Sequence, residues 1–246
     1  MEMKNKKRFW KDYWDKQSDG QHHLQEEQFL KEESDEKLFH LAKGGNLLDF
    51  GCGSADLLVY YTPFFKFSLG ADGSNLMLQK AKERLSAFNN QDNVMLINSD
   101  NYLIWSDIDK LLGTDFQFDC ISTGQVMQYL DRKEIEDFIS NAARHLSDNG
   151  KICLFDIVDS RRFSLWKAGL FKSNSLNFTV IMKLIINYLR CIVRKLKGKP
   201  FYDLGYVYPP SFFMELAQKN NLTASYYNSM FYDYRYHIVM GKKDTV

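Results

Sequence analysis

The most constraining feature of this sequence is a short glycine-containing stretch, LLDFGCGSADLL, which occupies positions 47–58. It begins with two leucines and reaches Asp49, after which Gly51 and Gly53 stand one residue apart. An apolar run that ends at glycines is typical of a buried strand followed by a tight turn. Ser54 is a suitable N-cap, so we expect a helix to begin directly after it. The stretch therefore predicts a first β-loop-α unit whose glycines allow a ligand to approach the backbone.

Two acidic residues in this stretch bear on the kind of ligand that the loop binds. A dinucleotide-binding loop has the pattern G-x-G-x-x-G/A, but Asp56 occupies the third glycine position here. A carboxylate at that position would repel a pyrophosphate, and Asp49 adds a second negative charge at the end of the strand. The two charges favour a cationic ligand and disfavour an NAD-dependent oxidoreductase. An ordinary strand-to-helix turn with chance glycines is the alternative.

The stretch resembles motif I of the class I S-adenosylmethionine (SAM)-dependent methyltransferases, whose pattern is apolar-apolar-Asp/Glu-x-Gly-x-Gly. Ala55 takes the third small position of that pattern, which is a mild departure. Asp72 lies 72 − 49 = 23 residues past Asp49, at the end of the second predicted strand, where a carboxylate accepts hydrogen bonds from ribose hydroxyls. Asp100 follows the third predicted strand, where members of the family commonly accept from the adenine amino group. Asp-Asn at that point is also ordinary turn chemistry.

The resemblance implies that SAM is the cofactor, and it assigns to the cofactor site residues at the ends of strands and in the loops after them. These are Asp49, Gly51, Cys52, Gly53, Asp72, Gly73, Ser74, Asp100, Asn101, Tyr102, Thr123, Gly124 and Gln125. The four cysteines lie far apart and form no C-x-x-C pair, which argues against a zinc site or a disulfide framework and for a reducing cytoplasm, and we expect no metal. The charged N-terminus contains no apolar signal-peptide core, so we expect a cytoplasmic protein.

Strands and helices alternate along the chain, as a doubly wound, mostly parallel sheet requires. The last two predicted strands, 222–228 and 232–242, have no helix between them and therefore predict an antiparallel hairpin. Five β-α units closed by such a hairpin give a seven-stranded α/β sheet, which is the layout of the class I methyltransferases. We expect four parts: an N-terminal helical cap at 1–45, a SAM-binding Rossmann-like core at 46–160, a basic helical insert after the fifth strand at 161–205, and a C-terminal helix and hairpin at 206–246 that complete the core.

The net charge of +1 conceals a strongly basic insert. Residues 160–199 contain ten Lys and Arg and no Asp or Glu, which leaves 32 − 10 = 22 basic against 31 acidic residues in the rest of the chain. Apolar residues recur at helical spacing from 178 to 196 with basic residues on the other side, which indicates a basic amphipathic helix. Lys183 and Arg190 interrupt the apolar run too often for a transmembrane span.

Three roles of this helix stay open. In the first role, the helix is a lid whose apolar stripe packs on the domain over the acceptor. In the second role, it contacts an anionic membrane surface through residues 178–197. The second role would place the protein peripherally on the inner face of the membrane. The third role, nucleic-acid binding, is unlikely because the polar stripe has no aromatic residues among its basic ones.

Catalytic residues are not evident, because methyl transfer from a sulfonium depends mainly on holding the nucleophile against the methyl carbon and excluding water. The candidate bases are His22, His23, Asp156 and His237. Gln128 stands where many small-molecule methyltransferases carry His, and the Asn/Asp-Pro-Pro-Tyr/Phe signature of amino-methylating nucleic-acid enzymes is absent. We therefore expect a SAM-dependent methyltransferase that acts on a small-molecule or lipid-like acceptor. A non-catalytic SAM-binding scaffold or regulatory subunit is the alternative.

Overall fold

A seven-stranded sheet with the order β3-β2-β1-β4-β5-β7-β6 forms the centre of the protein. The structure, a computed structural model, describes residues 26–89, 92–100, 103–173, 178–196 and 205–243. The first five strands run parallel, and the last two add an antiparallel hairpin to β5. They are β1 (Asn46–Phe50), β2 (Phe67–Asp72), β3 (Val94–Asn98), β4 (Phe118–Gly124), β5 (Leu146–Val158), β6 (Leu222–Asn228) and β7 (Arg235–Lys242). The predicted α/β fold with a C-terminal antiparallel hairpin is confirmed.

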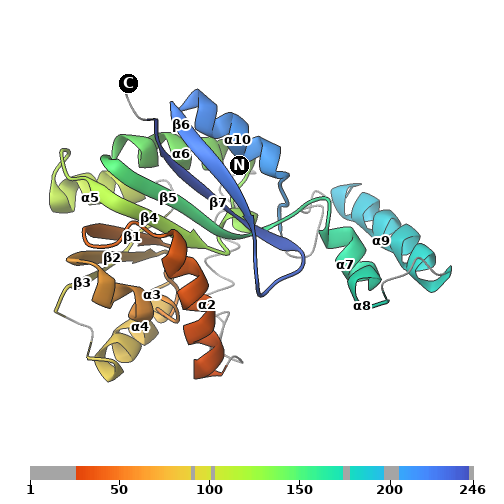
Figure 1. Ribbon diagram of the computed structural model, residues 1–246, viewed down its shortest axis with the longest axis horizontal. Coiled ribbons are helices and arrows are strands. Elements are labelled where there is room, and N and C mark those ends of the chain that lie inside the picture. The colour runs from red at the N-terminus through yellow and green to blue at the C-terminus, as the bar shows by residue number, and fades with distance from the viewer. Residues whose placement is uncertain (1–25, 90–91, 101–102, 174–177, 197–204, 244–246) are drawn as a thin grey trace.

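Helices cover both faces of the sheet (Figure 1). One face packs against α5 (Ile104–Leu112), α6 (Arg132–Arg144) and α10 (Pro210–Lys219). The other face packs against α2 (Glu27–His40), against α3 (Leu58–Tyr61) with the short 3-10 turn η1 (Thr62–Phe64), and against α4 (Asn75–Ala87). Successive side chains of a strand point to opposite faces, so Leu47 joins the second core and Leu48 the first. The central strands therefore pack against the helices on both faces of the sheet.

Side-chain caps fix where two of the helices begin. The sequence Asp131-Arg-Lys-Glu134 predicts a capping box at the start of α6. The structure confirms it, since Asp131 accepts from the Glu134 backbone N–H at 3.0 Å and the Glu134 carboxylate accepts from the Asp131 N–H at 2.8 Å. Ser74, which follows Gly73, is a suitable N-cap in the sequence, and it caps α4 by accepting from the Met77 N–H at 3.3 Å. The predicted cap at Ser54 is wrong. Its hydroxyl donates to Asp56, and α3 begins only at Leu58 because the glycine loop continues through the intervening residues.

The residues Asp148-Asn149-Gly150 are typical of a turn, and the sequence predicts one here, but this prediction is also wrong. This segment lies inside β5, where the pairing with β4 shifts register between the pairs Phe118–Leu146 and Cys120–Lys151. The extra residues on β5 form a bulge in the strand and do not end it.

The insert after β5 contains three helices that stand to one side of the sheet (Figure 1). They are α7 (Phe163–Ala168), α8 (Leu170–Ser173) and α9 (Phe178–Leu196). The predicted amphipathic helix is therefore present as α9. Within the described ranges, no helix is both long and apolar enough to cross a membrane.

Candidate functional site

The loop after β1 lies at the carboxyl edge of the parallel strands, where the strand order reverses between β1 and β4. Ligands of open α/β sheets bind at this kind of edge. Both glycines of the loop have positive φ, 76° at Gly51 and 54° at Gly53. A Cβ at Gly51 would lie 2.3 Å from a methyl carbon of Val126, whereas a Cβ at Gly53 would meet nothing within 4 Å. The backbone at Gly53 is thus open to an approaching ligand.

Asp72, at the end of β2, connects this loop to the next one. Its carboxylate accepts from the Gly53 N–H at 3.0 Å and from the Ser74 N–H at 2.8 Å. The side chain is half-buried, so part of it faces solvent. Asp100 lies close by, because a Cβ at Gly73 would be 3.7 Å from an oxygen of the Asp100 carboxylate. The structure therefore brings together the loops that carry the glycines, Asp72 and Asp100.

Asp49, at the end of β1, is 7% exposed and accepts from the Ser122 hydroxyl of β4 at 2.7 Å. Burial raises the pKa of its carboxyl to about 6, the Ser122 hydrogen bond opposes this rise, and the negative charge of Asp72 adds to it. A cation placed beside such a group would favour its ionised form and lower the pKa again. Asp49 is therefore suited to a positively charged ligand.

Backbone strain gathers at the same edge. Among the described residues other than glycine, Ala55, Gln125 and Asp156 have positive φ, at 61°, 57° and 53°. Ala55 lies in the glycine loop, Gln125 directly follows β4, and Asp156 interrupts β5 near its carboxyl end. Two further residues with positive φ, Asn89 and Asn221, follow helices, where this conformation is common for Asn. Strain of this kind concentrates at ligand sites.

At the end of β4 and just beyond it, two buried polar atoms lack hydrogen-bond partners among the described residues. Gln128 lies in the 3-10 turn η2 (Met127–Tyr129) and is 3% exposed. Its carbonyl oxygen accepts from Arg235 at 3.3 Å, but its amide nitrogen has no partner, and neither has the hydroxyl of Thr123. Buried polar atoms are usually paired, so these two are candidates for contact with a bound molecule.

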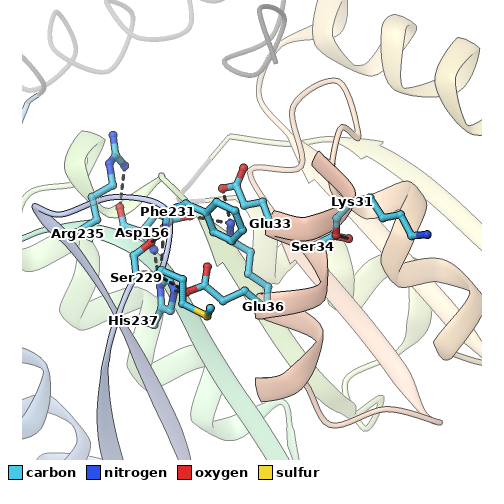
Figure 2. Close-up of polar contacts among 11 residues, drawn as sticks. Lys31, Glu33, Ser34, Glu36, Asp156, Ser229, Phe231, Arg235 and His237 are labelled. Carbon is cyan, nitrogen blue, oxygen red and sulfur yellow. Dashed lines mark hydrogen bonds and ion pairs between the residues drawn. The ribbon is translucent and has the colours of Figure 1, made fainter. Parts of the chain in front are cut away.

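A buried charge network joins α2 to β5 and β7 near this edge (Figure 2). The Lys37 ammonium of α2 contacts Glu33 of the same helix and lies 2.8 Å from the Asp156 carboxylate, and these side chains are at most 1% exposed. The His237 ring accepts from the Asp156 N–H at 3.1 Å, and its other nitrogen lies 3.1 Å from Glu36. The arrangement anchors α2 on the sheet.

The network keeps Lys37 and Asp156 charged. Burial alone would lower the pKa of Lys37, but Asp156 and Glu33 raise it above its ordinary value. Burial alone would raise the pKa of Asp156, but the positive charges of Lys37 and Arg235 hold it well below its ordinary range. A carboxylate of such low basicity is a weak proton acceptor. The assignment of Asp156 and His237 as catalytic bases remains a prediction, and their contacts fit a structural role.

The remaining predicted site residues are either outside the described part of the chain or close to the glycine loop. Asn101, Tyr102, His22 and His23 lie outside the described residues. Cys52 is buried, and burial raises the pKa of its thiol well above the ordinary value. Thr123, Gly124 and Gln125 lie at the end of β4, beside the loop after β1.

A glycine loop at the reversal of strand order, with carboxylates after three neighbouring strands, defines a Rossmann-like nucleotide-binding protein. Residues 48–152 match the model of a methyltransferase domain. No curated protein matches the sequence. The resemblance to the class I SAM-dependent methyltransferases is thus confirmed, since residues 48–152 match the model of a methyltransferase domain and the sheet has the layout that the resemblance implies.

Solved structures show the same fold at low sequence identity. A magnesium protoporphyrin IX methyltransferase from Synechocystis with bound SAM has a TM-score of 0.60 and 14% identity, with 97% of each chain covered. A SAM-dependent methyltransferase from Clostridium acetobutylicum has a TM-score of 0.58 and 15% identity, with 88% of this chain and 92% of that chain covered. An O-methyltransferase family protein from Burkholderia thailandensis has a TM-score of 0.58 and 12% identity, and the match covers 89% of this chain but only 56% of that one.

Proposed function

We propose that the protein binds SAM and transfers its methyl group to a small-molecule or amphipathic acceptor. The observation that carries the proposal is the arrangement of Asp49, Asp72 and Asp100 around the open backbone at Gly53. Asp49 suits the cationic part of SAM, Asp72 suits the ribose hydroxyls, and Asp100 suits the adenine amino group. The methyltransferase domain match and the SAM-bound structural neighbour support the choice of cofactor.

When bound, SAM supplies a methyl group on a sulfonium, and its displacement moves the C–S bonding electrons onto sulfur while the acceptor forms the new bond. The chain's part is to position the acceptor and exclude water. Thr123 at the end of β4 and Gln128 in η2 are buried and have polar atoms that no described residue satisfies, and we assign these two groups to orienting the acceptor. Neither is a base, so we expect acceptors whose nucleophile is deprotonated by water or is already ionised.

Transfer of a labelled methyl group tests this function. The protein is incubated with methyl-labelled SAM and a small-molecule extract of its source cells, and the demethylated product and labelled acceptors are measured by mass spectrometry. We expect demethylated product only when protein, SAM and extract are all present, and much less with Asp72→Ala. Tight SAM binding without turnover in any extract fraction would favour the alternative, a SAM-binding scaffold.

The affinity for SAM should depend on pH through Asp49. Its pKa of about 6 means that the carboxyl is mostly ionised at pH 7 and about one-tenth ionised at pH 5. Because the cationic ligand binds the ionised form, we expect the Kd for SAM to rise about tenfold from pH 7 to pH 5. Titration calorimetry at several pH values measures this change.

The matched control for this titration is Asp49→Asn, which retains the shape of the side chain and can still accept from Ser122. This variant should bind SAM weakly at every pH and show little change of Kd between pH 7 and pH 5. A wild-type Kd that stays constant, or that falls in acid, would remove Asp49 from the cofactor site.

A further inference from the structure

We propose that α9 docks the protein on the surface of an anionic lipid bilayer. This helix has 19 residues and carries ten large apolar side chains that are exposed, by fractions between 37% and 82%. They are Phe178, Ile181, Met182, Ile185, Ile186, Tyr188, Leu189, Ile192, Val193 and Leu196. An exposed apolar surface of this extent marks an interaction site, because soluble proteins otherwise bury it.

The exposed apolar residues form one continuous face. α9 packs on α7, and its buried residues are Val180 and Cys191, with Leu184 and Asn187 half-buried between them. These four follow each other at spacings of four, three and four residues and so form one narrow stripe. At about 100° per residue, the ten exposed side chains occupy an arc roughly 160° wide on the opposite side of the helix. The apolar face therefore points away from α7, and the lid role, in which the apolar stripe packs on the domain, is not observed among the residues that the structure describes.

Charge identifies an anionic bilayer as the occupant of this face. Lys183 and Arg190, both exposed, border the apolar arc, and residues 160–199 contain ten basic residues and no acidic one. Apolar side chains bordered by basic ones are the pattern of helices that lie in the interface of anionic membranes. A second copy docking through the same face would bring two positively charged borders together, which opposes self-association. The helix lies on the bilayer, since no described helix has the length and hydropathy to cross one.

The position of the insert connects docking to the candidate site. α7 to α9 follow β5, and Asp156 near the carboxyl end of β5 belongs to the edge that carries the cofactor loop. A bilayer against α9 would lie on the side of the protein where an amphipathic acceptor enters. This consequence rests on the proposed function, whereas the docking does not.

Vesicle flotation with the full-length protein, in the absence of SAM, tests the docking. Vesicles of phosphatidylcholine with phosphatidylglycerol are compared with vesicles of phosphatidylcholine alone, at low and high salt. We expect binding to the anionic vesicles that weakens as salt rises. Leu189→Glu, at the centre of the apolar arc, should weaken this binding by at least about tenfold. Lys183→Ser combined with Arg190→Ser should weaken it about tenfold and flatten its salt dependence.

The matched control is Leu111→Glu on α5, on the opposite side of the sheet from α9 (Figure 1). Leu111 and Leu189 are both exposed leucines on helices, at 47% and 55%. Leu111→Glu should leave vesicle binding within about twofold of the wild type, and both variants should unfold at the wild-type temperature. The proposal is overturned if the wild type does not bind anionic vesicles or if the two Glu variants bind equally. It is also overturned if Leu189→Glu dissociates a dimer in sedimentation while vesicle binding persists. Because SAM is absent, none of these outcomes depends on the cofactor site.

Discussion

Asp72→Ala is expected to weaken SAM binding by about 100-fold. The carboxylate would accept from both ribose hydroxyls, and two hydrogen bonds to a charged group contribute together about 3 kcal/mol, which corresponds to a factor of about 100 in Kd. Asp72 is placed for this role because its bonds to the Gly53 and Ser74 amides fix its orientation while part of the side chain remains exposed. Titration calorimetry of the wild type and the variant measures the change.

Asp72→Ala also removes the hydrogen bonds to the Gly53 and Ser74 amides, so the effect of the lost ribose contact must be separated from the effect of a changed loop. A SAM analogue without the ribose hydroxyls provides this control. If Asp72 acts on the hydroxyls, Asp72→Ala should cost little affinity for the analogue. An equal loss for SAM and for the analogue would show that Asp72 acts by holding the loop. Asp72→Asn, which retains the size of the side chain and one acceptor oxygen, should bind SAM with intermediate affinity.

Lys37→Met is expected to lower the free energy of unfolding by about 3–5 kcal/mol, which is the cost of removing one partner from a buried ion pair. Lys37 and Asp156 are buried and 2.8 Å apart, and the methionine would leave the Asp156 and Glu33 carboxylates without their cation. In a chain of this size such a loss lowers the unfolding temperature by roughly 10 °C. Urea and thermal unfolding measure it. The difference from the wild type should narrow in acid, because protonation of the carboxylates removes the unpaired charge.

Lys31→Met provides the matched control on the same helix, since Lys31 is exposed. We expect it to change stability by no more than about 0.5 kcal/mol. Equal stability of the two methionine variants would mean that the buried network does not anchor α2.

The sheet could be predicted because its signals are local. Leu47 and Leu48 precede glycines, Asp131 and Glu134 form a capping box, and the hairpin follows from two strands without a helix between them. Each signal is contained within a few residues. The cofactor loop and the acidic residues after β2 and β3 are recognisable for the same reason, since parallel strands bring their carboxyl ends to one edge.

The charge network could not be predicted, because its partners are far apart in sequence. Glu33 and Lys37, four residues apart on a helix, indicate an exposed surface pair when only the sequence is considered. Their burial depends on Asp156, which is more than a hundred residues away and contacts them only once β5 and α2 have packed. The same holds for Arg235 and Gln128, which are 107 residues apart in the sequence. The exposure of the apolar face of α9 could not be predicted either, because a helical apolar pattern does not indicate whether the protein itself or another partner covers that face.

The central claim, a SAM site at the edge of β1 and β2, is tested most directly by the choice of cofactor. Calorimetric titration of the wild-type protein with SAM, with its demethylated product and with NAD compares the ligands at one site. We expect one SAM or one product molecule to bind per chain, because Asp49 and Asp72 favour a cation and ribose hydroxyls, and we expect no heat from NAD. Saturable binding of NAD without binding of SAM would contradict the claim.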